Sequence, residues 1–294
     1  MPPFAVNEFS TLPASFEEDV ASYRAAGADG IGICELKLLE GRETEQLRTF
    51  RDSGLRAASC VPAVPSILPL AALPGPESPE ERLEAIISGM RRLAPFEPQA
   101  FVCLTGAADG EDEDAARQAV VAALRVLGDE AQRLGVPLGV EPMSARFRDG
   151  WTLSTTLDDA AELVAEADSP GLGLVFDTWH LCDTHDVAGA IHRHAESIVA
   201  VHVSDWREPT RGWCDRALPG DGVADLPALL EALDSAGWRG FYELEVFSDD
   251  GTFGDAYEDS LWKEPSAELA RRGREAFLEM WRARNASVTA SKAR

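Results

Sequence analysis

The chain has 294 residues, which is long for an ordinary domain but typical of a single α/β barrel. Its 45% hydrophobic and 27% charged residues supply both a core and a polar surface, so a largely disordered chain is excluded. Asp and Glu outnumber Lys and Arg by 51 to 27, and the net charge of −24 opposes binding to nucleic acid or to an anionic membrane surface.

Short apolar segments alternate with longer amphipathic segments from one end of the chain to the other. In chain order, strands are expected at 4–10, 29–36, 55–62, 100–106, 137–143, 173–179, 199–205 and 241–248. Helices are expected at 15–27, 43–54, 78–93, 113–135, 155–167, 186–197, 225–237 and 266–284. This alternation predicts an α/β fold, a single (β/α)8 TIM barrel, over residues 1–284. The polar residues 285–294 are expected to form a disordered tail.

The sequence also carries expectations about the protein's surroundings. It does not begin with a basic segment followed by an apolar one, and no apolar run approaches the ~20 residues that span a bilayer. We therefore expect a cytoplasmic protein without a membrane partner. The five cysteines have no C-x-x-C spacing and their number is odd, which favours reduced thiols over disulfides.

Four ionisable residues fall near the ends of strands five to eight of the predicted barrel. They are Glu141, Asp177, His202 and Glu245, and the intervals between them each fit one βα unit of about thirty residues or more. Active sites of such barrels lie where the strands end, so we expect the four side chains to meet at one rim. Three buried carboxylates need a cation, and a set of three oxygen ligands and one nitrogen ligand suits a divalent metal.

Alternation along the strands predicts which neighbouring side chains face the lumen. In the seventh strand, Ile198 and His202 are expected to point inward and Val199 to face the helices. Glu243 also points inward, but it lies deeper than Glu245, so a structural or supporting role is expected. His180 follows Asp177 by three residues and should lie over the mouth of the barrel.

Several segments carry a resemblance to a known family. They are "GVEPM", "VFDTWH", "VHVSDW", "YELEVFS" and "DRALPGDG", and they resemble segments of the xylose isomerase-like TIM barrel family of sugar isomerases and epimerases, including its inositol-catabolism and ketose 3-epimerase branches. The resemblance runs from the first strand to the last helix. It implies one divalent metal ion bound by Glu141, Asp177, His202 and Glu245. Manganese is the first expectation, with cobalt, magnesium or zinc as alternatives.

The same resemblance implies roles in catalysis and substrate binding. Glu141 and Glu245 would double as the acid/base pair, and His180 and Arg216 would hold substrate oxygens. Arg207 and Arg211 lie in the same loop as Arg216 and leave that assignment open.

Four tryptophans, Trp151, Trp179, Trp206 and Trp213, fall in predicted loops at the rim, where they suit sugar rings or pack the loops. We count Trp179 among the substrate-binding residues.

Together these features predict an enzyme of carbohydrate metabolism. The first expectation is a metal-dependent isomerase or epimerase of a sugar or cyclitol, working by proton transfer through an enediolate intermediate. The same residues permit a dehydratase or lyase acting on an inosose or keto-sugar. A third alternative is a non-catalytic sugar-binding or scaffold subunit.

Two further expectations concern partners. An endonuclease with this barrel is disfavoured, because no histidine precedes His180 and the net charge opposes DNA. The amphipathic last helix, with Leu269, Phe277, Met280 and Trp281, could pack on its own barrel or on a second subunit, so a homodimer is possible.

Overall fold

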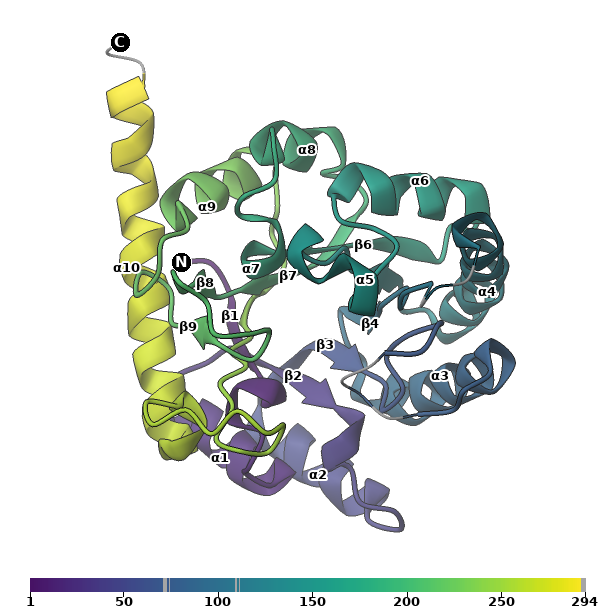
Figure 1. The fold of residues 1–294 in the computed structure, drawn as a ribbon. Helices are drawn as coiled ribbons and strands as arrows, with labels where there is room; N and C mark the ends of the chain where they lie inside the picture. Colours follow the sequence, from purple (N-terminus) through teal and green to yellow (C-terminus); the bar gives the residue numbers. More distant parts are fainter. Residues whose placement is uncertain (71–72, 74, 109, 111, 292–294) are drawn as a thin grey trace.

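Eight strands form a closed parallel barrel surrounded by helices (Figure 1). The computed structural model describes residues 1–70, 73, 75–108, 110 and 112–291, with side chains as far as residue 284. The barrel strands are β1 (Phe4–Asn7), β2 (Gly30–Cys34), β3 (Arg56–Val61), β4 (Ala100–Cys103), β5 (Leu138–Val140), β6 (Leu172–Asp177), β7 (Ile198–Val203) and β10 (Tyr242–Leu244). They follow one another around the barrel in the order β1-β10-β7-β6-β5-β4-β3-β2. The predicted single (β/α)8 barrel is confirmed.

The outer layer consists of one helix after each barrel strand. These helices are α1 (Phe16–Ala25), α2 (Glu43–Ser53), α3 (Pro79–Leu93), α4 (Glu113–Leu134), α6 (Leu157–Ala167), α8 (Val187–Arg193), α9 (Leu226–Ser235) and α10 (Ser266–Ser291). Local sequence explains several of their ends. Ser15 and Thr156 form capping boxes at the starts of α1 and α6, and Gly135 takes a left-handed conformation, φ 72°, where α4 stops.

Short elements connect the strand ends to the helices. They are α5 (Arg148–Trp151), α7 (Thr178–Leu181), the 3-10 turns η1 (Glu8–Thr11), η2 (Glu35–Lys37), η3 (Ala94–Phe96), η4 (Ala145–Phe147) and η5 (Leu261–Lys263), and the strands β8 (Asp205–Trp206) and β9 (Arg216–Ala217). Strands β8 and β9 pair antiparallel as a separate small sheet. Sequence periodicity did not predict this pair, because two-residue strands are too short to show a period.

The prediction for the start of β7 is wrong. The register between β6 and β7 shifts after the pair Leu174 and Ile198, so that Val175 pairs with Ala200. Val199 consequently packs against the lumen cluster instead of facing the helices, and Ile198 joins the outer core. Alternation assumes regular pairing, and an irregularity of this kind moves side chains to the other face. His202, beyond the shift, points inward as predicted.

The last helix closes the ring between α9 and α1 (Figure 1). Leu269 and Phe277 are fully buried in the main core, and Met280 and Trp281 pack against it. The apolar face of α10 therefore covers its own barrel. A homodimer remains a prediction. Helix α10 continues past residue 284, where the sequence predicted that the disordered tail begins. The boundary between domain and tail remains a prediction. Residues 292–294 lie outside the described residues.

Two other expectations can be compared with the structure. All five cysteines are free thiols, as predicted. Among the described residues, none of the helices combines the length and the apolar character that crossing a bilayer requires. The cytoplasmic location remains a prediction.

Candidate metal centre and substrate cavity

The four predicted ligands meet at the carboxyl end of the barrel. Asp177 ends β6 and His202 lies near the end of β7, while Glu141 and Glu245 directly follow β5 and β10. One ligand atom from each residue lies within 4.8 Å of all the others, and the four residues are between 0% and 5% exposed. Four side chains from four strands thus form one buried cluster.

The distances inside this cluster fit a bound metal ion. His202 Nδ1 lies 3.1 Å from Glu141 Oε1 and 3.5 Å from Glu245 Oε2. Metal–ligand bonds of about 2.0–2.2 Å place neighbouring ligand atoms roughly 3.0–3.5 Å apart. Three carboxylates with one imidazole are also a donor set that divalent cations accept. The residues therefore fit the metal that we expected, and their individual roles as ligands remain a prediction.

Burial and charge oppose each other at these residues. Burial raises the pKa of Glu245 to about 7, although His202 and Arg216 act to lower it. Burial alone would lower the pKa of His202, but the carboxylates of Glu245 and Glu141 raise it well above the usual value. Burial alone would raise the pKa of Asp177, but Arg216 and His180 lower it. Such opposed shifts are typical of sites that bind cations or move protons.

Arg216 is the buried cation beside the cluster. It lies in β9, which the pairing with β8 folds back over the barrel, and it is 3% exposed. Its Nη1 donates to Asp177 Oδ2 at 2.8 Å and to Glu245 Oε2 at 3.0 Å. The guanidinium carbon also lies 4.7 Å from the ring centre of Trp179, which fixes the group further.

The other two arginines of the loop lie elsewhere. Arg207 and Arg211 form ion pairs with Asp215 and Asp259, and neither lines the cavity. The sequence did not decide which of the three arginines lies at the site, and the structure brings Arg216 to the cluster.

His180 lies next to Arg216 and is also buried. The backbone N–H of Ser144 donates to His180 Nδ1 at 3.1 Å. Burial lowers the pKa of His180 to about 4, so the ring is neutral at pH 7 and carries its hydrogen on Nε2. His180 Nε2 lies 3.2 Å from Arg216 Nη2, which is also a hydrogen-bond donor. Two donors that face each other need a common acceptor, and an oxygen atom of a ligand would supply one.

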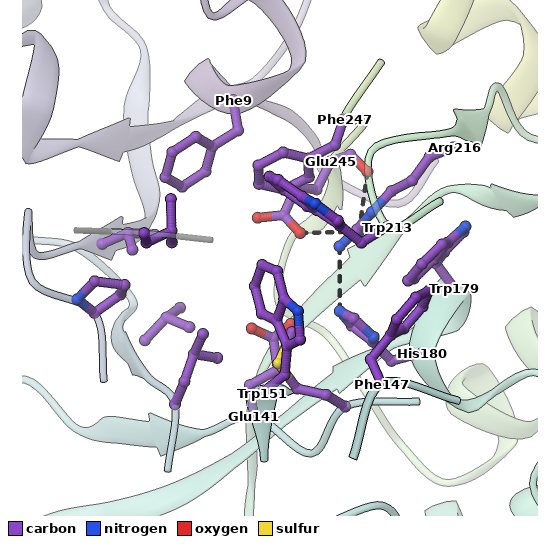
Figure 2. A pocket seen from close by; sticks show the side chains of 16 residues that line it. Phe9, Glu141, Phe147, Trp151, Trp179, His180, Trp213, Arg216, Glu245 and Phe247 are labelled. Carbon is purple, nitrogen blue, oxygen red and sulfur yellow. Dashed lines mark hydrogen bonds and ion pairs between the residues drawn. The ribbon is translucent and has the colours of Figure 1, made fainter. Parts of the chain in front are cut away.

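A cavity of about 620 Å³, open to solvent, lies above the cluster (Figure 2). Its polar lining residues are Glu141, His180, Arg216 and Glu245, and its other lining residues are Phe9, Val61, Pro65, Leu73, Val102, Leu104, Met143, Phe147, Trp151, Trp179, Trp213 and Phe247. The predicted substrate-binding residues His180, Arg216 and Trp179 all line it. Sequence reasoning missed Phe9, Phe147 and Phe247. The positions of Phe9 and Phe247, just beyond barrel strands, were the available signal.

Glu243 has a supporting position, as expected. It accepts hydrogen bonds from Asn7 Nδ2 at 2.6 Å, from Ser59 Oγ at 2.8 Å and from the Ser59 backbone N–H at 3.0 Å. These bonds link β10 to β1 and β3 across the lumen. A Cβ at Gly32 would collide with Glu243 Oε1, so only glycine leaves room for this arrangement.

Comparison with known proteins identifies the family. The family described as xylose isomerase-like TIM barrel matches residues 20–280. The chain belongs to the xylose isomerase-like TIM barrel family. This membership confirms the resemblance inferred from the five sequence segments.

Relatives within and around this family differ in their named activities. A 3-dehydroshikimate dehydratase from Pseudomonas putida is 25% identical over 258 residues, which cover 81% of this chain and 37% of that protein. The chain therefore spans little more than a third of that relative's length. A solved structure of a Sinorhizobium meliloti protein has a TM-score of 0.83 at 24% identity, covering 95% of this chain and 98% of that one.

A solved L-ribulose 3-epimerase has a TM-score of 0.76 at 21% identity, covering 100% of this chain and 99% of that one. At these identities the two structural comparisons establish the fold of this family member.

Proposed function

We propose that the protein is a metal-dependent isomerase or epimerase of a sugar or cyclitol that carries a carbonyl group. The main support for this proposal is that Glu141 and Glu245 both belong to the four-residue cluster and both line the cavity. They follow β5 and β10, which are separated by β7 and β6 in the barrel. Their carboxylates can therefore approach a ligand from two directions.

The chemistry is proton transfer at the carbon next to the carbonyl. A bound divalent cation would stabilise the negative charge that develops on the substrate oxygens. One carboxylate removes the proton, and the other can return a proton to the opposite face or to the neighbouring carbon.

His180 and Arg216 would orient the substrate. The Nε2–H of His180 and Nη2 of Arg216 converge at 3.2 Å, and a substrate oxygen between them would accept from both. Such an oxygen would give these two neighbouring donors a common acceptor.

Dehydration is the second candidate. The relative from Pseudomonas putida is named a dehydratase, and it matches this chain over 258 residues. The same proton abstraction starts an elimination if a hydroxyl group leaves from the next carbon.

Solvent exchange distinguishes these reactions. The manganese-loaded protein is incubated in D2O with ketoses, inososes and 3-keto-sugars, and deuterium at the carbon next to the carbonyl is followed by NMR. Exchange with a rearranged product of unchanged composition supports the isomerase or epimerase, whereas loss of water supports the dehydratase.

The variants Glu245→Gln and Glu141→Gln should each reduce exchange at least ~100-fold. Glu279→Gln is the matched control, because Glu279 is exposed on α10 far from the cavity lining. Undiminished exchange in both site variants would refute the assignment of the acid/base pair. If no substrate exchanges while metal is bound, the proposed reaction is wrong and a non-catalytic sugar-binding role takes its place.

A further inference from the structure

The cavity has a polar end and an aromatic end. Of its four polar lining residues, Glu141 and Glu245 belong to the cluster and Arg216 donates to it. His180 lies 3.2 Å from Arg216 Nη2. The remaining twelve lining residues have apolar or aromatic side chains. A ligand in this cavity therefore meets charged and imidazole groups on the side that faces the cluster, and on the other side it meets apolar side chains and aromatic rings whose only hydrogen-bonding groups are indole N–H donors.

Four aromatic side chains form a continuous surface, which we call the aromatic wall: Phe9, Trp151, Trp213 and Phe247. Phe9 lies 5.0 Å from Phe247, Trp213 lies 5.7 Å from Phe247, and Trp151 lies 4.9 Å from Trp213, as ring centres. The four residues come from loops after β1, β5, β8 and β10. Four separate connections thus contribute to one apolar surface (Figure 2).

The wall faces open space instead of the protein interior. All four of its side chains are half-buried, whereas Trp179 and Trp206 are 1% and 5% exposed. Trp206 does not line the cavity, and Trp179 stacks between Phe147 and the guanidinium of Arg216. Of the tryptophans at the rim, Trp206 therefore packs the loops, Trp179 lines the cavity beside Arg216, and the two tryptophans of the wall are available to a ligand.

This division of the cavity restricts the substrate. A free sugar carries a hydroxyl group on almost every carbon, and hydroxyl groups directed at the wall would exchange their hydrogen bonds to water for at most the indole N–H groups of Trp151 and Trp213. A flat apolar group placed there would stack on indole and phenyl rings instead. The site suits a molecule with oxygens at one end and a hydrophobic ring at the other.

As a consequence of the proposed function, we propose that the substrate is a carbonyl-bearing sugar or cyclitol derivative with a flat apolar substituent, such as an aromatic aglycone. The oxygen-bearing ring lies at the cluster, and the substituent lies against the aromatic wall.

Binding of two simple glycosides tests this assignment. The manganese-loaded protein is titrated by calorimetry with phenyl β-D-glucopyranoside and with methyl β-D-glucopyranoside. The phenyl compound is expected to bind roughly tenfold more tightly, since it adds one ring that contacts two aromatic side chains. Trp213→Ala should reduce this preference to about threefold or less, and Trp151→Ala should act in the same direction.

Trp238→Ala is the matched control. Trp238 is a half-buried tryptophan that precedes β10 and does not line the cavity, and its Nε1 donates to the Phe241 carbonyl. The Trp238→Ala variant should therefore keep the preference for the phenyl glycoside. The comparison of the two glycosides on the wild-type protein tests the assignment even if one wall variant does not fold.

Equal affinity for the two glycosides, or no binding of either while metal is bound, would overturn the assignment. So would a preference that persists in both wall variants. Binding requires no turnover, so these outcomes are independent of the deuterium exchange that tests the proposed reaction. If simple ketoses exchange deuterium but the phenyl glycoside binds no more tightly than the methyl glycoside, the proposed reaction is supported and the proposed apolar substituent is refuted.

Discussion

Glu243 and Glu245 lie two residues apart on one segment, and the structure predicts opposite consequences when each is changed to glutamine. Glu243 accepts three buried hydrogen bonds and is not part of the four-residue cluster in the described structure. Glu245 contributes a ligand atom to the cluster and lines the cavity. We expect Glu243→Gln to lower the stability of the protein and to leave metal binding intact. We expect Glu245→Gln to weaken metal binding and to change stability less.

The magnitude for Glu243→Gln follows from its donors. The amide oxygen can still accept from Asn7 Nδ2 and Ser59 Oγ, but the amide nitrogen then faces the Ser59 backbone N–H. One buried donor loses its acceptor and meets another donor, which costs about 2–3 kcal/mol. For a chain of this length the entropy of unfolding is roughly 0.6 kcal/mol/K, so Tm should fall by about 3–5 °C.

Scanning calorimetry with and without manganese, together with metal titration calorimetry, measures both quantities. Glu243→Gln should bind manganese within about threefold of the wild-type affinity. Glu245→Gln should weaken manganese binding by ~100-fold or more, since a charged ligand is lost, and should change the Tm of the metal-free protein by less than Glu243→Gln does.

Two results would refute this reasoning. If Glu243→Gln weakened manganese binding as strongly as Glu245→Gln, then Glu243 would have to be counted among the metal ligands. An unchanged Tm in Glu243→Gln would show that its three hydrogen bonds contribute nothing to stability.

Three further predictions follow from the same structure. Removal of bound manganese with EDTA should lower Tm by about 4 °C, because a metal present at 100 times its Kd adds about 2.7 kcal/mol, and calorimetry after manganese is restored should show the recovery. Arg216→Met removes the buried guanidinium that pairs with both Asp177 and Glu245 and should destabilise the metal-free protein by about 3–5 kcal/mol in urea unfolding; failure of manganese to recover part of this loss would contradict the placement of the metal. Burial raises the pKa of Glu8 and of Asp19, so the stability that they contribute is full below about pH 4 and is lost as pH rises through their higher folded values. Glu8→Gln should flatten that fall as pH rises above about pH 4, and an unchanged slope in urea unfolding experiments would count against a raised pKa of Glu8.

The barrel and its four clustered residues could be predicted because both depend on local patterns. Apolar segments of strand length alternate with amphipathic ones, and each barrel strand ends at the same rim, so a polar residue at a strand end is already placed in space. Glu141, Asp177, His202 and Glu245 satisfy this condition on four consecutive strands. Glu243 was separated from them by the same reasoning, since two residues further back along a strand lie deeper in the lumen.

Other features depended on contacts that no local pattern records. The choice of Arg216 over Arg207 and Arg211 depends on the pairing of two-residue strands β8 and β9, and the inward position of Val199 depends on an irregularity between β6 and β7. The predicted alternation had no means of locating either.

The sequence by itself determined the fold and the chemistry available at the rim, because periodicity and strand-end position are properties of short segments. Only the tertiary structure decided the shape of the cavity. Phe9 and Phe247 are separated by more than two hundred residues and stack at 5.0 Å because β1 and β10 pair where the barrel closes. Which side chains surround a ligand is thus a consequence of long-range pairing, and that pairing also assembles the aromatic wall from separate connections of the barrel.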